Sequence, residues 1–209
     1  MSDYIHFLLW PFLAGLVLVG IHVYFGLHVI KRGIIFVDLS LAQIAALGVT
    51  LALLLQYDPD SITSYLFSLS FALAGATIFT FTRNVEGRVP QEAFIGIVYA
   101  VSSAAAILLV SHSPEGAEHI QHLLVGSLLT VSPAAVLKTA AVYAAVGAFH
   151  WFARRRFLDL TFNLRPRGTQ KRLWDFLFYA TFAVVVTSSV KICGVLLVFI
   201  FLVVPSVFA

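Results

Sequence analysis

The sequence predicts an all-α fold, a polytopic integral membrane helix bundle, and three observations support this class. Hydrophobic residues make up 60% of the 209-residue chain and charged residues only 11%, whereas about a quarter of a typical soluble domain is charged. Apolar runs of about 20 residues, the length that crosses a bilayer as a helix, recur along the chain. The connections between them are short or polar. We therefore expect residues 1–209 to form a single transmembrane domain.

The first apolar run extends from near residue 5 to about residue 30. Asp3 precedes it, without any Lys or Arg, and this pattern is not that of a cleaved signal peptide. We expect a retained first span, which gives about seven transmembrane helices in all. The other six are predicted near 34–56, 65–83, 93–111, 133–152, 173–190 and 192–209.

A shorter apolar piece lies at 122–131 and reads HLLVGSLLTV. It is too short to cross the bilayer easily, so we expect a short re-entrant or interfacial helix. An eighth crossing is the alternative, and it would invert the orientation of everything that follows. The single cysteine, Cys193, excludes an intrachain disulfide and is expected to be a packing residue.

Basic residues predict the orientation, because Lys and Arg gather on the cytoplasmic side of a membrane protein. Lys138 and Lys191 are assigned to the outer side, together with Asp3, Asp58, Asp60, Glu115 and Glu118. The N-terminus is then outside and residue 209 inside the plasma (inner) membrane. This pattern explains the pI of about 9.2 without a nucleic-acid partner. The residues assigned to the inner side are Lys31, Arg32, Arg83, Arg88, Arg154, Arg155, Arg156, Arg165, Arg167, Lys171 and Arg172.

Catalytic and nucleotide-binding motifs are missing from the sequence. It contains no H-E-x-x-H, no G-x-S-x-G and no Gly-Lys dipeptide, and therefore no phosphate-binding P-loop. We expect a protein that is not an enzyme and binds no cofactor itself. Any ATP that drives it is used by a separate subunit.

One carboxylate stands inside the second apolar run, where residues 34–49 read IIFVDLSLAQIAALGV. An ionisable group in a span is costly and marks a transport pathway by default, so Asp38 is a candidate for the translocation path. Two other interpretations stay open. Asp38 could cap a helix by accepting from the backbone N–H of Ser40 or Leu41, or it could form a buried salt bridge.

Four segments, in order along the chain, resemble the ABC-3 family, the membrane permeases of metal-chelate ABC importers for zinc, manganese and iron. The family's second-helix signature is similar to HVIKRGIIFVDLSLAQIAALGVTLAL, and its central helix to AFIGIVYAVSSAAAILLVS. A leucine- and glycine-containing hallmark resembles EHIQHLLVGSLLTVSP. A later helix, matched at Gly194 and Pro205, resembles SSVKICGVLLVFIFLVVPSVFA.

The resemblance implies a permease subunit that moves a divalent metal ion, as substrate, by alternating access. It implies a homodimer in membrane lipid, a cytoplasmic ATP-binding subunit that uses ATP, and an extracytoplasmic metal-binding protein. It also implies one more helix than this sequence holds. The alternatives are an ABC permease for a non-metal or chelated cargo and a stand-alone secondary transporter, for which inverted repeats would be expected.

The second helix departs from the family pattern at one position. Family members carry an aspartate and a histidine four residues apart that are thought to line the metal path, and Gln43 occupies the histidine position here. Asp38 and Gln43 are five residues apart, roughly 140° around a helix, so both can face one site only if the helix is unwound or starts between them. An amide oxygen is also a harder ligand than imidazole.

A second candidate for metal binding lies in the outer loop. Five histidine and glutamate side chains could receive a divalent cation at the outer mouth. The alternative is a solvated polar loop, because the spacing matches no fixed metal motif. These residues are His112, Glu115, Glu118, His119 and His122.

The basic loop at 153–172 contains the stretch FLDLTF between its arginines. In the family that the chain resembles, this loop carries a short helix that rests in a groove of the ATPase. A loop that only stops translocation would explain the arginines but not the apolar stretch. The residues expected to dock the ATPase are Phe157, Leu158, Asp159 and Phe162.

Overall fold

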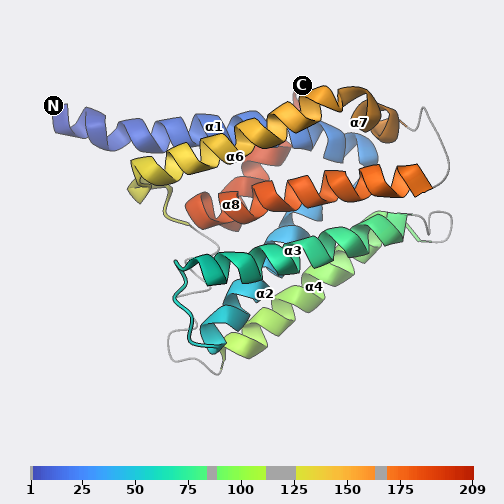
Figure 1. The fold of residues 1–209 in the computed structure, drawn as a ribbon, viewed down its shortest axis with the longest axis horizontal. Coiled ribbons are helices and arrows are strands. Elements are labelled where there is room, and N and C mark those ends of the chain that lie inside the picture. Colours follow the sequence, from blue (N-terminus) through green and yellow to red (C-terminus); the bar gives the residue numbers. More distant parts are fainter. Residues whose placement is uncertain (1, 84–88, 112–125, 163–168) are drawn as a thin grey trace.

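A computed structural model describes residues 2–83, 89–111, 126–162 and 169–209, and all regular structure in these ranges is helical (Figure 1). This confirms the predicted fold class. The helices are α1 (Ser2–Arg32), α2 (Val37–Leu54), α3 (Ile62–Thr82), α4 (Gln91–Val110), the 3₁₀ turn η2 (Leu128–Thr130), α6 (Pro133–Phe152), α7 (Arg154–Thr161) and α8 (Thr169–Val207).

Local sequence signals explain several of the helix boundaries. The Ser61 side chain accepts from the backbone N–H of Ser64 at the start of α3. Ser132 caps α6 in the same way, directly before Pro133, which suits the first helical position. Between α1 and α2, Gly33 adopts a φ of +67°, a left-handed conformation that glycine accepts without strain. The chain therefore reverses within four residues.

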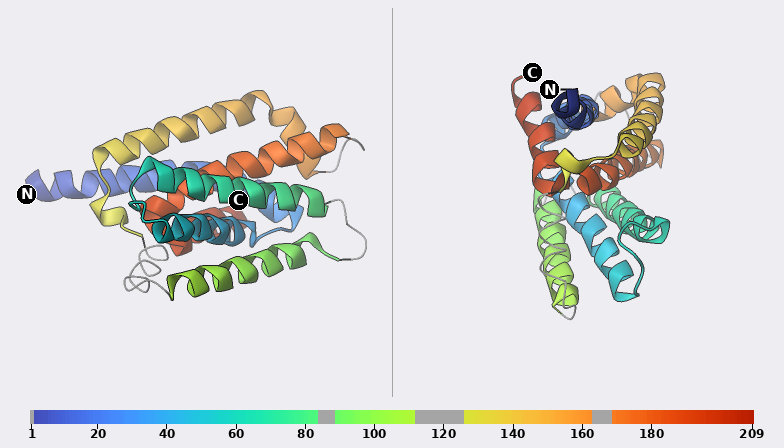
Figure 2. Two further views of the ribbon diagram at one scale, coloured as in Figure 1. Left: turned by 60° about the horizontal axis from the view of Figure 1, so that its bottom comes forward. Right: turned by 90° about the vertical axis from the view of Figure 1, so that its left-hand side faces the viewer.

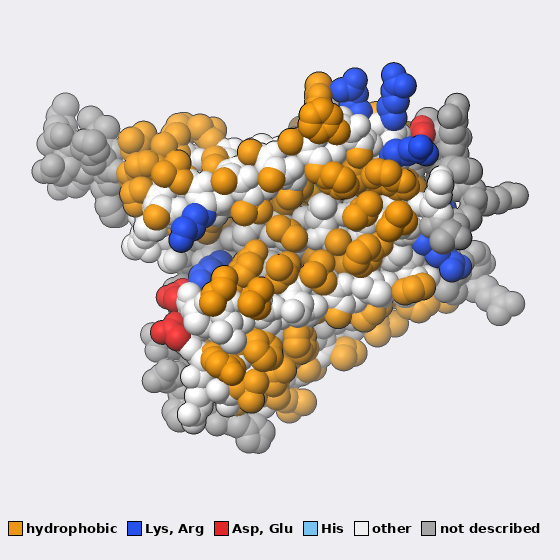
Figure 3. Space-filling view, in the orientation of Figure 1, with side chains coloured by type: hydrophobic (Ala, Val, Ile, Leu, Met, Phe, Trp, Pro, Cys, Tyr) orange, Lys and Arg blue, Asp and Glu red, His pale blue; other side chains and the backbone are white. Residues whose placement is uncertain are grey.

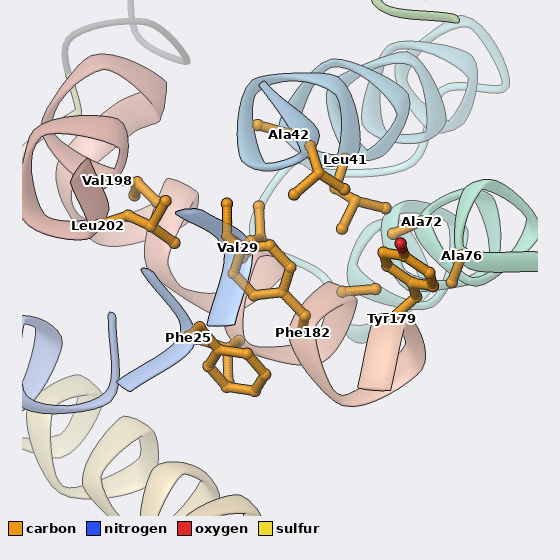
Figure 4. Packing of buried hydrophobic residues seen from close by; sticks show 14 of the residues in the cluster. Phe25, Val29, Leu41, Ala42, Ala72, Ala76, Tyr179, Phe182, Val198 and Leu202 are labelled. Carbon is orange, nitrogen blue, oxygen red and sulfur yellow. The ribbon is translucent and has the colours of Figure 1, made fainter. Parts of the chain in front are cut away.

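Helix α8 lies in the middle of the bundle. Figure 1 shows α1 and α6 on one side of it and α2, α3 and α4 on the other, and Figure 2 gives the same arrangement from two further directions. The buried apolar core follows α8 and receives side chains from α1, α2 and α3 (Figure 4). Phe25 of α1 stacks on Phe182 of α8, with 4.8 Å between the ring centroids, near the centre of this core.

Glycine allows two of these helices to approach closely. A Cβ at Gly48 of α2 would lie 2.7 Å from the backbone oxygen of Phe67 in α3, which is closer than real side chains come. Ser68 of α3 donates a hydrogen bond across the same contact to the backbone oxygen of Ala45, at 3.0 Å. Small residues at helix contacts are typical of membrane bundles.

Within the described residues, six helices are long and apolar enough to cross a membrane, where the sequence predicts seven. The difference lies in α8, which holds both of the last two predicted spans. Gly194 breaks this helix with a non-helical φ of 73° and ψ of 166°. The helical stretch that follows, 195–207, turns away from the first part of α8 (Figure 2) and is too short to cross a bilayer alone.

The break in α8 also receives the short apolar piece, of which residues 126–131 are described. Only the turn η2 is regular there, and the backbone N–H of Ser127 donates to the carbonyl of Ile192 at 3.2 Å. Gly126 lies against the backbone of Cys193 and Gly194, where a larger residue has no room. This described part therefore inserts against α8 and does not cross the bundle.

Charged side chains separate toward the two ends of the molecule. On the face shown in Figure 3, most Lys and Arg side chains lie at the end that holds α7 and the start of α8. Acidic side chains lie mainly at the opposite end, beside the α2–α3 connection, where Lys191 pairs with Asp60 at 3.1 Å. This separation agrees with the predicted grouping of the basic residues.

Candidate translocation site and ATPase-docking helix

Asp38 lies in the first turn of α2 and is only 1% exposed. The N-cap of this helix is Phe36, whose backbone N–H donates to Glu92 of α4 at 2.9 Å. The backbone N–H of Ser40 donates to the carbonyl of Phe36, not to Asp38. The interpretation of Asp38 as a helix cap is therefore wrong.

The Asp38 carboxylate also has no partner for its charge in the described part of the chain. Neither carboxylate oxygen accepts a hydrogen bond, and none of the ion pairs found there includes Asp38. The nearby Cys193 thiol is close enough to interact with it electrostatically. Asp38 therefore lies near the break of α8 at Gly194. A buried, unpaired carboxylate at this depth is suited to hold a passing cation.

Gln43 is buried as well, with 9% of its surface exposed, and its side chain makes no hydrogen bond to a described residue. Helix α2 is continuous from Val37 to Leu54, so nothing unwinds between Asp38 and Gln43. The two side chains leave the helix roughly 140° apart and do not form one site within this chain. The structure supports Asp38 as a candidate site and leaves Gln43 on another face.

The candidate metal-entry residues of the outer loop, His112, Glu115, Glu118, His119 and His122, lie outside the described residues. Among the residues that are described, no group of three or more His, Cys, Asp or Glu side chains could hold a metal ion. The metal-entry interpretation therefore stays a prediction.

Helix α7 and its C-cap residue, Phe162, contain the predicted docking residues, and their side chains face in different directions. Leu158 and Phe162 are 44% and 52% exposed, and Asp159 is partly exposed. Phe157 is fully buried and stacks on His150 of α6, with 4.0 Å between the ring centroids. The expectation that Phe157 faces the ATPase is therefore wrong in this structure. It anchors α7 to the bundle, because an apolar ring beside α6 is removed from water.

Hydrogen-bonded histidines link α1 to neighbouring helices, and the sequence did not reveal these links. His22 lies between the carbonyl of Leu18, at 2.7 Å, and the Ser189 hydroxyl of α8, at 3.1 Å. The Tyr24 hydroxyl lies 3.0 Å from Nδ1 of His150 in α6. The only sequence feature that pointed to these hydrogen bonds was the presence of histidines within apolar runs. These ring nitrogens already have partners, so we assign them to packing.

Two basic residues that the sequence assigned to cytoplasmic connections are buried. Arg32 and Arg83 both pair with Asp175 near the start of α8. Their partner could not be identified from the sequence, because 92 residues separate Arg83 from Asp175. A lone aspartate among apolar and aromatic residues in a span was the signal that could have revealed it.

The fold and the buried carboxylate define a multi-pass helical membrane protein with a candidate path for a cation. Residues 4–209 match the model of the ABC 3 transport family, and the chain belongs to this family.

A curated relative and several solved structures are similar to this chain. The "Probable iron transport system membrane protein" of Haemophilus influenzae is 24% identical over 127 residues, which cover 59% of this chain and 46% of the relative. The chain thus spans about half the length of this curated relative. A structure of PsaBC from Streptococcus pneumoniae in complex with Fab has a TM-score of 0.74 and 21% identity, over 96% of this chain and 71% of that chain. At this identity, the structural likeness establishes the fold alone.

Proposed function

We propose that this chain is the membrane permease subunit of an ATP-driven importer for a divalent metal ion such as zinc, manganese or iron. Membership of the ABC 3 transport family supports the class of transporter. The observation that carries the cargo assignment is Asp38, a fully buried carboxylate without a partner among the described residues. The name of the H. influenzae relative, which refers to iron transport, agrees with a metal cargo.

The proposed mechanism is alternating access. Two copies of the permease enclose the path, an extracytoplasmic binding protein delivers the ion, and ATP hydrolysis by a cytoplasmic subunit reorients the helices. Asp38 compensates the charge of the ion while the ion is out of water, because an ionised carboxylate is stabilised by a cation in a low dielectric. The chain itself carries out no chemical step. The exposed side chains of Leu158, on α7, and Phe162, directly after it, supply the apolar contact with the ATPase.

Uptake in cells tests this proposal directly. The permease is expressed together with its ATPase and its binding protein, in cells that lack their own metal importers. We expect ATP-dependent accumulation of radiolabelled manganese, zinc or iron, and no accumulation when the ATPase is catalytically inactive. Absence of accumulation for all three metals, with the complex assembled in the membrane, would contradict a free metal cargo.

A permease for a chelated metal or a non-metal cargo is the second candidate, and Gln43 favours it. The amide replaces the histidine that the family pattern places on this helix, so an imidazole ligand suited to ions such as zinc is missing. Uptake of an iron chelate without uptake of free metal would distinguish this candidate. Family membership speaks against a stand-alone secondary transporter.

A further inference from the structure

Three charged side chains form a buried ion cluster where α1, α3, α7 and α8 meet: Arg32, Arg83 and Asp175. Arg83 ends α3; its guanidinium donates to the Asp175 carboxylate and, at 2.9 Å, to the backbone oxygen of Leu160 in α7. Arg32 ends α1 and lies 3.5 Å from the same Asp175 oxygen. Nε of Arg32 donates to the Thr161 hydroxyl of α7 at 3.2 Å. The cluster therefore joins four helices.

The charges of the buried ion cluster do not balance. Two guanidinium groups share one carboxylate, and the three side chains are 5% exposed or less. Arg83 donates directly to Asp175, whereas Arg32 is held less closely. Neither terminal nitrogen of Arg32 nor the second Asp175 oxygen makes a hydrogen bond of normal geometry within the described residues, although the buried Tyr179 hydroxyl interacts with the Arg32 guanidinium. The Arg32 guanidinium rests instead 3.8 Å from the centroid of the Phe178 ring.

Such a cluster is a poor source of stability, because burying unbalanced charges costs more free energy than packing apolar side chains of similar size. Buried ionic groups are better attested as devices that fix one arrangement of elements among several. The second Asp175 oxygen accepts no hydrogen bond within the described residues, and the Arg32 guanidinium lies 3.5 Å from the other oxygen of the same carboxylate. The cluster thus has a second pairing available, in which Arg32 closes onto this oxygen.

Helix α7 is attached to the buried ion cluster, so a movement of α7 would reach the charged side chains. Only the last turn of α7 is tied to the cluster, through the Leu160 carbonyl and the Thr161 hydroxyl, which also lies 2.6 Å from Nδ1 of His28 in α1. The same short helix carries the exposed side chains of Leu158 and Phe162. A displacement of α7 therefore changes the distances between the two arginines and their partners.

We infer that the buried ion cluster is the joint that transmits movement of α7 to α1, α3 and α8, with Arg32 changing its pairing to Asp175 as α7 moves. This inference rests on the proposed function, in which α7 docks the ATPase. Arg32, Arg83 and Asp175 are positioning residues and touch neither cargo nor nucleotide. If the charges of these side chains are removed, the complex should still hydrolyse ATP but transport less metal for each ATP.

The test uses the full permease complex, with its ATPase and binding protein, in liposomes that contain metal-free buffer. Metal uptake and ATP hydrolysis are measured together, and their ratio gives the coupling. Asp175→Asn keeps the size of the side chain and removes its charge, so we expect the ratio to fall about tenfold or more, as loss of one buried charge pair predicts. The ATPase should still copurify with the permease. Asp175→Glu, which keeps the charge, should recover part of the ratio.

Asp60→Asn is the matched control, because Asp60 also pairs with a basic residue, Lys191, but is 88% exposed at the other end of the bundle. Its ratio should stay within about twofold of the unaltered complex, since exposed ion pairs contribute little. An unchanged ratio in Asp175→Asn would overturn the inference. If Asp175→Asn fails to insert, Thr161→Val takes its place, and a normal ratio in that variant overturns the inference equally.

These outcomes are separable from failure of the proposed function. If the unaltered complex takes up no metal, the proposed function is contradicted. If it takes up metal and the cluster variants keep its coupling ratio, only the role of the cluster is contradicted.

Discussion

At the scale of single residues, the sequence shows where a charge is buried but not what surrounds it. Asp38 stands out because it interrupts an apolar run, and the structure confirms its burial. The sequence could not exclude a helix cap, since that depends on where α2 begins. The helix begins at Val37, after the tight turn at Gly33, so Asp38 lies two residues after the capping position, Phe36.

Replacing Asp38 tests the path directly. Asp38→Asn and Asp38→Ala should both reduce metal uptake about tenfold or more, because each removes the charge that compensates the cation. Neither should lower thermal stability, since the carboxylate caps no helix and its burial is itself costly. Uptake and the thermal midpoint are measured at equal membrane abundance. Uptake that stays normal in Asp38→Asn would show that this carboxylate is not on the path.

At the scale of elements, the length of the apolar runs predicted where most helices lie but not where the long helix α8 is broken. The predicted spans coincide with α1 to α4 and α6 to within a few residues, because length and composition largely determine a membrane helix. The break within α8 depends on one dihedral angle at Gly194 and on the insertion of η2 beside it. The side of α7 that faces the bundle likewise depends on tertiary contacts, and Phe157 was therefore misassigned.

The break in α8 predicts a strict requirement for glycine. Gly194 has a φ of 73° and a ψ of 166°, a conformation that other residues rarely adopt. Gly194→Ala should lower the free energy of unfolding by about 1–3 kcal/mol. Gly96→Ala in α4 is the control, because open space surrounds this position and alanine favours a helix. Thermal unfolding in detergent measures both variants. Equal midpoints for the two would contradict the strain at Gly194.

The two kinds of side chain on α7 predict two different effects. Phe157→Ala should destabilise the permease by about 3–5 kcal/mol, because it leaves a cavity beside His150. Leu158→Ser combined with Phe162→Ser should leave stability nearly unchanged, since both side chains are exposed. This double variant should lose copurification of the ATPase. Normal copurification would show that α7 docks through other residues.

At the scale of the whole molecule, the sequence could not predict which charged residues form ion pairs across the bundle. Among the described residues, most basic side chains gather at one end as predicted, because the positive-inside rule acts on each connection separately, whereas Arg88, Arg165 and Arg167 lie outside the described residues. That Arg32 and Arg83 turn inward to one carboxylate depends on four helix ends meeting. The Lys191–Asp60 pair, in contrast, joins two residues that the sequence had already placed on one side.

The predicted orientation can be tested by single cysteines at opposite ends, in a Cys193→Ser background. A cysteine at Asp60, which is highly exposed beside the α2–α3 connection, should react with an impermeant maleimide in intact cells. A cysteine at Arg155, exposed on α7, should react only after the membrane is opened, because basic connections stay in the cytoplasm. The unaltered chain serves as control, since Cys193 is buried and should not react from either side. Labelling at Arg155 in intact cells, without labelling at Asp60, would invert the orientation and place α7 away from a cytoplasmic ATPase.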